Sequence, residues 1–138
     1  MKAKNFLLFL LLLSCLHLNA QSIDYKVVFD ISSKDSVSQQ AVVREVDLIK
    51  SSNPDSKLEV VVYGQAIDLV VKDRSKQTDA IQQLLTKKDV SFKVCAITMK
   101  RNNITAAQLI PGIQTVPDGI YEIITKEHEG WGYIKVAH

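Results

Sequence analysis

The stretch LEVVVY, residues 58–63, decides the fold class of this chain because it is a short apolar run with a β-branched triplet and a single charge. Residues 25–31 contain a matching apolar triplet, Val27-Val28-Phe29. Continuous apolar runs of this length are typical of strands that are covered on both faces, as in a parallel sheet. Both segments therefore predict strands of a parallel sheet.

Three further segments predict strands. Residues 90–95 alternate between apolar and polar positions and end at Cys95, whereas residues 113–116 and 131–136 are weaker apolar runs. Helical periodicity fills most of the gaps between the five strands. The expected helices cover residues 37–51, residues 77–88, a short stretch from Cys95 to Arg101, and a last helix that opens at Pro117 and Asp118 and closes at Gly130.

Two local signals support these helix boundaries. Ser36 and Gln39 have the spacing of a capping box, in which each side chain satisfies a free amide at a helix start. Asn102 and Asn103 follow two basic residues and tolerate the left-handed turn that ends a helix. Strand and helix therefore alternate along the chain, which is the order of a doubly wound α/β sheet of about five mostly parallel strands flanked by helices.

In such a sheet, right-handed crossovers bring every loop that leaves a strand to the same edge. Ligands and chemistry gather at that edge. We expect it to collect four segments: residues 30–35, 64–68, 95–98 and 117–119. Asp30 is expected to behave as an ordinary turn aspartate that bonds local backbone amides.

The first 20 residues have the pattern of a secretory signal peptide. Lys2 and Lys4 precede an apolar run over residues 6–13, and Ala20 provides a small residue at a cleavage point. The run is too short to span a bilayer, which needs about 20 apolar residues. Residues 1–20 are thus expected to direct export, to the periplasm in a bacterial host. Lipidation at Cys15 is a weaker alternative, because apolar residues continue past this cysteine.

Residues 21–138 then form one domain of ordinary size. Two of the 17 basic residues of the chain lie in the leader, so basic and acidic residues are equal in number in the remainder. This balance argues against a nucleic-acid or anionic-membrane partner. Cys95 is the one cysteine outside the leader, and so no internal disulfide can form in the mature chain.

Cys95 is the main candidate for chemistry. It ends a predicted strand and begins a helix, where backbone amides stabilise a thiolate, and the cations Lys93, Lys100 and Arg101 lie nearby in sequence. The alternative is a buried packing cysteine, since free cysteine is among the most buried residue types. The residues alone leave both readings open.

The stretch VSFKVCAITMKRNNI, residues 90–104, resembles the cysteine-bearing segment of the DsrE/DsrF-like family, in which a strand ends in cysteine and a short basic helix follows. Other stretches agree in order and register: residues 25–31, VVVYG at 60–64, VPDG at 116–119 and EGWGY at 129–133. This resemblance implies a flavodoxin-like domain that assembles into homotrimers or homohexamers.

The resemblance also implies a function in a sulfur relay, as a sulfurtransferase or sulfur carrier. In the best understood relatives the cysteine accepts a sulfur atom as a persulfide and passes it to a partner, and the resemblance assigns that function to Cys95 here. The partner would be a sulfur donor or acceptor protein, or a small thiol. Relatives of this kind are cytoplasmic, whereas this chain carries an export signal, which argues against tRNA thiolation. No cofactor is implied.

Two alternatives come from other functional classes. One is a non-catalytic oligomeric binding or assembly module in which Cys95 is structural. The other, a thiol peroxidase, is weaker because the mature chain has no second cysteine to resolve an oxidised thiol.

His128 is the remaining candidate, as a proton donor or base for Cys95 or, preferably, as a histidine at a subunit contact. It follows Ile120 and Ile124 at helical spacing, on a stripe that with Ile123 is expected to face inward or toward a partner. His128 and its two glutamate neighbours do not form a metal signature, because ligands would have to converge from more than one segment.

Overall fold

The computed structural model describes residues 24–136. Its five strands are β1 (Lys26–Ile31), β2 (Lys57–Val62), β3 (Val90–Cys95), β4 (Gln114–Val116) and β5 (Gly132–Val136). The α-helices are α2 (Ser36–Ser52), α3 (Thr78–Leu85), α4 (Ala96–Arg101) and α5 (Gly119–His128). Two 3-10 helices, η2 (Gly64–Val70) and η3 (Ala106–Gln108), complete the order. The expected strands and helices are therefore all present.

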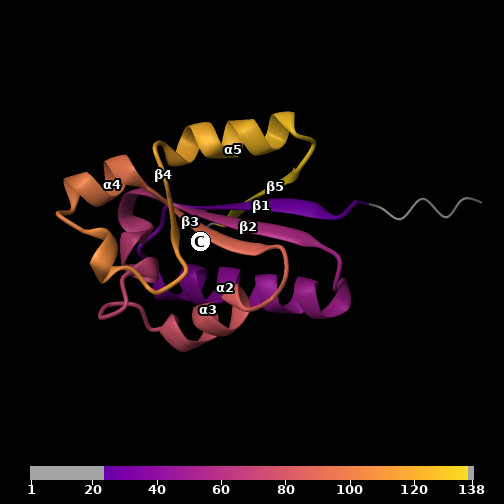
Figure 1. Cartoon of the computed structure of the whole chain (residues 1–138), viewed down its shortest axis with the longest axis horizontal. Helices are drawn as coiled ribbons and strands as arrows, with labels where there is room; N and C mark the ends of the chain where they lie inside the picture. Colours follow the sequence, from indigo (N-terminus) through magenta and orange to yellow (C-terminus); the bar gives the residue numbers. More distant parts are fainter. Residues whose placement is uncertain (1–23, 137–138) are drawn as a thin grey trace, which may run out of the picture.

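The strands form one parallel sheet in the order β4-β3-β2-β1-β5. The chain crosses from β1 to β4 in one direction and then returns past three strands to place β5 beside β1. Since crossovers are right-handed, the reversal puts the returning helix on the opposite face. Figure 1 shows this arrangement, with α5 on one face of the sheet and α2 and α3 on the other. The predicted α/β fold is confirmed.

The two faces of the sheet differ in character. The face under α2 and α3 is the main apolar core and includes Phe29 and Phe92, both fully buried. The face under α5 has a small apolar cluster centred on Val28, Val61 and Ile123. Most of the other sheet positions on that face carry polar or charged side chains, and Cys95 lies among them in register with Val116 of β4. A 10-residue helix covers this polar face.

Three local predictions differ from the structure. The N-cap of α2 is Asp35, whose carboxylate accepts from the Ser38 amide at 2.7 Å, while the Gln39 side chain bonds the Ser33 carbonyl. Asp35 is thus the cap, one residue earlier than the expected Ser36. Secondly, the segment expected as a loop after β2 is the 3-10 helix η2, whose buried apolar residues join the core.

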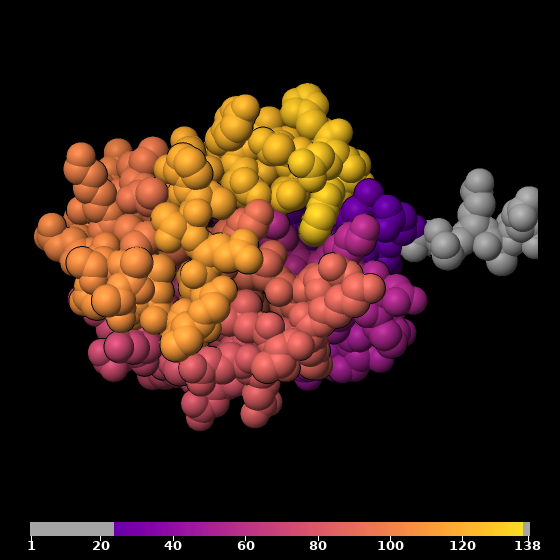
Figure 2. Space-filling view, in the orientation of Figure 1, coloured from indigo at the N-terminus to yellow at the C-terminus, as the bar shows by residue number. Residues whose placement is uncertain are grey.

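The third difference concerns α5, where three isoleucines were expected to face inward or toward a partner. Only Ile123 is buried, whereas Ile120 and Ile124 are 55% and 45% exposed. In Figure 2, α5 forms the upper rim of the molecule with its outer side uncovered. One monomer therefore leaves part of the apolar stripe of α5 in solvent.

The predicted leader, residues 1–20, and Cys15 lie outside the described residues. Within residues 24–136, no helix has the length and apolar character needed to cross a membrane.

Candidate active site

Cys95 lies at the carboxyl end of β3 and is the N-cap residue of α4. Its side chain is on the α5 face and is 5% exposed. Strand β3 ends here because the chain turns directly into helix, which gives the residue extended backbone angles of φ −69° and ψ 121°. The predicted position of Cys95 at the strand-to-helix junction is confirmed.

Gly119, the first residue of α5, packs directly against Cys95. A Cβ atom at this glycine would lie 3.2 Å from Cys95 Cβ, 3.3 Å from Val61 Cγ1 and 3.4 Å from Tyr63 Cβ. These separations are shorter than the ordinary carbon–carbon contact of about 3.5–4.0 Å. The start of α5 can reach the cysteine because residue 119 has no side chain.

The Asp118 carboxylate caps α5 by accepting from the amides of Ile120 and Tyr121. The Gly119 amide takes no part in these bonds and instead donates to the Cys95 sulfur. The amides at the beginnings of two helices therefore converge on one thiol, since α4 contributes those of Ile97 and Thr98. Such amides carry partial positive charge that favours a thiolate.

Burial of the Cys95 thiol raises its pKa, but hydrogen bonds outweigh this effect. The backbone N–H groups of Gly119, Thr98 and Ile97 and the Thr98 hydroxyl together hold the pKa below the ordinary thiol value of 9.0. A structural cysteine in apolar surroundings has a raised pKa. Cys95 therefore has polar hydrogen-bond donors beside its thiol rather than apolar surroundings alone.

Thr98 links the thiol to a third segment of the sheet edge. Its hydroxyl accepts a 3.0 Å hydrogen bond from the Gly64 amide at the start of η2 and can donate to the Cys95 sulfur. Gly64 has a φ of +60°, in the left-handed region that favours glycine. The loops after β2, β3 and β4 thus meet at the expected edge.

A charged cluster lies beneath α5 beside the cysteine. The Lys93 ammonium is 2.6 Å from Glu122 Oε1 and 2.9 Å from Glu59 Oε2. Glu59 is 3% exposed, and its Oε1 atom has no hydrogen-bond partner among residues 24–136. Burial raises the pKa of Glu59 despite the neighbouring Lys93. The pKa of Glu122 is lowered. Burial acts to raise it, but Lys93 and the other partners of Glu122 outweigh burial.

A second polar cluster holds the edge strand β5. Asp30 accepts from the Tyr133 hydroxyl and from the Lys135 ammonium, both at 2.7 Å. Lys135 also donates to Tyr63 Oη at 3.3 Å. Asp30 lies within β1 and is 5% exposed, so the expectation of a turn aspartate bonded to local amides was wrong. These partners lie about 100 positions later in sequence, where no local pattern reveals them.

The supporting residues proposed from the sequence do not join the cysteine. Lys100 and Arg101 occupy the exposed last turn of α4, and the groups that shift the pKa of Cys95 do not include them. His128 is exposed at the last position of α5. At 1.5 Å per residue, the helix places it roughly 13 Å from Gly119. The structure therefore separates His128 from the thiol.

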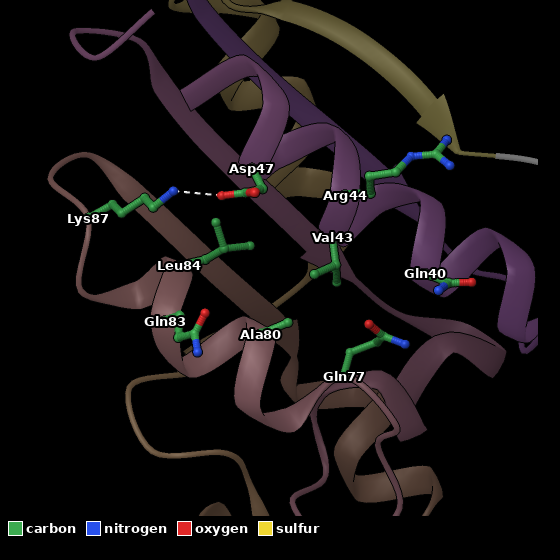
Figure 3. Close-up of a pocket in the computed structure, with 9 residues that line it drawn as sticks. All are labelled: Gln40, Val43, Arg44, Asp47, Gln77, Ala80, Gln83, Leu84 and Lys87. Atoms are coloured by element: carbon green, nitrogen blue, oxygen red, sulfur yellow. Dashed lines mark hydrogen bonds and ion pairs between the residues drawn. The ribbon is translucent and has the colours of Figure 1, made fainter. Parts of the chain in front are cut away.

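A hollow of about 360 Å³ lies on the other side of the molecule, between α2 and α3. Figure 3 shows its apolar floor of Val43, Ala80 and Leu84, surrounded by polar side chains and the 2.6 Å ion pair of Lys87 with Asp47. It is lined by residues of α2, α3 and their flanks, and Cys95 takes no part in it. Within residues 24–136, no group of three or more His, Cys, Asp or Glu side chains could hold a metal ion.

Sequence reasoning missed Gly119, Thr98, Glu59 and Glu122 as parts of the cysteine's surroundings. Thr98 and Gly119 fell within the predicted edge segments, and so their nearness to Cys95 was available from topology. Glu59 carried a weak signal, as the one charged residue inside the apolar run at 58–63. A charge within such a run is costly unless it is paired.

Solved structures share this fold. A protein of unknown function from Methanobacterium thermoautotrophicum matches with a TM-score of 0.76 and 26% identity, over 81% of this chain and 99% of the other. A conserved protein of unknown function from Bacteroides thetaiotaomicron matches with a TM-score of 0.68 and 16% identity, over 86% of this chain and 100% of the other. The ychN protein of E. coli matches with a TM-score of 0.68 and 13% identity, over 82% and 99%.

The last two matches, at low identity, show the fold alone. No curated protein matches the chain. The model of the DsrE/DsrF-like family matches residues 26–136, from the first residue of β1 to the last of β5. Membership suggests a function related to sulfur relay, and the chain belongs to the DsrE/DsrF-like family.

Proposed function

We propose that this protein handles reactive sulfur through a persulfide on Cys95. The observation that carries the proposal is the thiol's surroundings: backbone amides from two helix starts lower the pKa of a buried cysteine in a DsrE/DsrF-like chain. A lower pKa enlarges the thiolate fraction at neutral pH, and the thiolate is the form that attacks sulfur.

In the proposed reaction, the Cys95 thiolate attacks the outer sulfur of a polysulfide or of thiosulfate. A new S–S bond forms at Cys95 while the donor's S–S bond breaks. The shortened polysulfide, or sulfite, leaves with the electron pair of that bond. No external oxidant is consumed, because the sulfane sulfur is transferred at its existing oxidation level. Amides that stabilise a thiolate can also stabilise the persulfide anion.

The test exposes the purified, reductant-free protein to polysulfide or to thiosulfate and weighs the intact chain. A mass gain of one or more sulfur atoms that is removed by reductant and lost in Cys95→Ser is expected. A thiol label should also react at Cys95 in the folded protein. If neither sulfur nor label reaches this residue, whose exposed fraction is 5%, the proposal is wrong and the cysteine is structural.

The rival function is a non-catalytic binding or assembly module. The exposed side of α5 supports self-assembly. Ile120, Tyr121 and Ile124 are 55%, 70% and 45% exposed on one short helix. An apolar surface of this kind commonly marks a protein contact. We propose that it contacts further copies of this chain in a homotrimer or homohexamer. Light scattering of the purified protein and of Ile120→Asp tests this assembly.

Export is a separate proposal that rests on residues 1–20 alone. Fractionation of the host cell and N-terminal sequencing of the mature protein test cleavage after Ala20. Processing before Cys15, with a lipid on that cysteine, would replace the proposal of a periplasmic protein with one of a membrane-anchored protein.

A further inference from the structure

We propose that Glu59, Lys93 and Glu122 form a clamp that sets the reactivity of Cys95 by holding the first turn of α5 against the sheet. These residues act as positioning residues, since their effect on the thiol passes through the Gly119 amide. The clamp itself does not depend on the proposed function. Only the biological use of a reactive Cys95 thiol rests on that function.

The clamp joins three elements at a largely buried contact. Glu59 belongs to β2, Lys93 to β3 and Glu122 to α5, and all three side chains lie between the sheet and the helix. Their side chains are 3%, 16% and 18% exposed. The two contacts of Lys93, at 2.6 and 2.9 Å, have the length of charge-assisted hydrogen bonds.

The position of the clamp couples it to the cysteine at both ends. Lys93 precedes Cys95 by two residues on the same face of β3, and Glu122 lies one helical turn after Gly119. The bond between Lys93 and Glu122 therefore holds the turn of α5 whose first amide donates to the Cys95 sulfur. Apolar packing on this face is small, with Ile123 as the one buried isoleucine of α5.

The protonation of the cluster is compatible with a clamp. One ammonium lies between two carboxyl groups, and Lys126 approaches Glu122 at 3.9 Å but is closer to Glu129, at 3.1 Å. Glu59 and Glu122 are also within hydrogen-bonding reach of each other. A proton on the Glu59 carboxyl supplies a hydrogen-bond donor to this cluster of one ammonium and two carboxyl groups. The neutral form of Glu59 thus tightens the cluster.

The decisive variant is Glu122→Ala, because loss of its charge and loss of the clamp change the pKa of the Cys95 thiol in opposite directions. Removal of a nearby negative charge, taken alone, would lower the pKa of the thiol. Release of the clamp withdraws the Gly119 amide and raises that pKa. We expect a rise of about one unit, the scale of one weakened hydrogen bond to a charged sulfur. Alkylation by iodoacetamide at pH 7 should slow about threefold, since the gain in thiolate nucleophilicity offsets part of the loss.

The measurements are thiolate absorbance at 240 nm and alkylation rate, each followed against pH on the folded protein. Glu122→Gln keeps an oxygen that can accept from Lys93, and should recover most of the wild-type pKa. Glu127→Ala is the matched control, because it removes a carboxylate from the exposed side of the same helix. Circular dichroism confirms that each variant is folded.

Asp118 and Tyr63 lie beside Gly119, and Lys100 and Arg101 lie in the exposed last turn of α4. All four are unchanged in these variants, so they cannot cause the difference. An unchanged or lowered thiol pKa in Glu122→Ala overturns the clamp. So does a Glu122→Gln profile that matches Glu122→Ala. Sulfur loading of the wild-type protein is measured separately, and its failure would overturn the proposed function without affecting the clamp, which is judged on alkylation.

Discussion

The substitution Gly119→Ala tests the central geometry of the site. Its new methyl group would meet Cys95 Cβ at 3.2 Å, Val61 Cγ1 at 3.3 Å and Tyr63 Cβ at 3.4 Å. Two of these three atoms are Cβ atoms, which cannot move without their backbone. The first turn of α5 must therefore withdraw from the sheet by roughly 0.3–0.5 Å to restore ordinary contacts.

This withdrawal weakens the bond from the Gly119 amide to the Cys95 sulfur. A hydrogen bond to a charged group contributes about 1.5–3 kcal/mol, and one pKa unit corresponds to about 1.4 kcal/mol. Complete loss of the bond would raise the thiol pKa by about 1–2 units. Partial loss should raise it by about 0.5–1 unit, and added burial by the methyl group acts in the same direction.

The free energy of unfolding should fall by about 0–2 kcal/mol, because a helix-propensity gain and steric crowding oppose each other. Alanine gains up to about 1 kcal/mol over glycine in a helix, and crowding against the sheet opposes this gain by about 1–3 kcal/mol. Gly119 does not have a positive φ, so the substitution adds no backbone strain of that kind. The thiol pKa is measured by absorbance at 240 nm, and unfolding by urea.

The control is Gly132→Ala at the amino end of β5. Its new Cβ would meet Lys26 O at 3.5 Å and Val27 Cγ2 at 4.0 Å, which are ordinary contacts. The thiol pKa should be unaltered there. A folded Gly119→Ala protein whose thiol pKa equals that of the wild type would refute the argument that the α5 amide stabilises the thiolate.

Three further outcomes are expected. Cys95→Ser should abolish sulfur loading. Because the pKa of the thiol is lowered in the folded protein, the thiolate stabilises the fold above pH 9.0, and this contribution is lost as the pH falls through the folded pKa. The difference in urea-unfolding free energy between wild type and Cys95→Ser should therefore shrink toward acid. Tyr133→Phe should cost about 1 kcal/mol by loss of the bond to Asp30. That bond raises the pKa of Tyr133 to about 12, and the contribution should therefore persist below pH 10.0 and disappear as the pH rises through about 12. Glu59→Gln should have the unfolding free energy of wild type in acid and become more stable than wild type as the pH rises through the raised pKa of Glu59. The reason is that the wild-type carboxyl must then ionise while buried. A difference in unfolding free energy between the two proteins that is the same at every pH would contradict this.

The sequence by itself determined the framework of this protein. Apolar runs at residues 25–31 and 58–63 specified strands because burial on both faces leaves a continuous apolar run. The run at 90–95 specified a strand because burial on one face leaves an alternating pattern. The strand-to-helix position of Cys95 followed from the same local patterns, since parallel strands with right-handed crossovers leave few alternatives for their loops. Asp35, however, replaced the expected cap of α2, because both choices satisfy the same free amides and differ by one residue.

The tertiary structure decided what surrounds the thiol and how far each candidate lies from it. Gly119 meets Cys95 across 24 positions of sequence, and Asp30 meets Tyr133 across 103. His128 is distant although its helix begins at the cysteine, because a straight helix carries its last residue away from its first. Side-chain contacts between separate segments depend on how whole helices and strands pack together. Local periodicity in the sequence carries no information about that packing. The framework around Cys95 was therefore readable from the chain, while the groups that set the charge of its sulfur required the folded sheet.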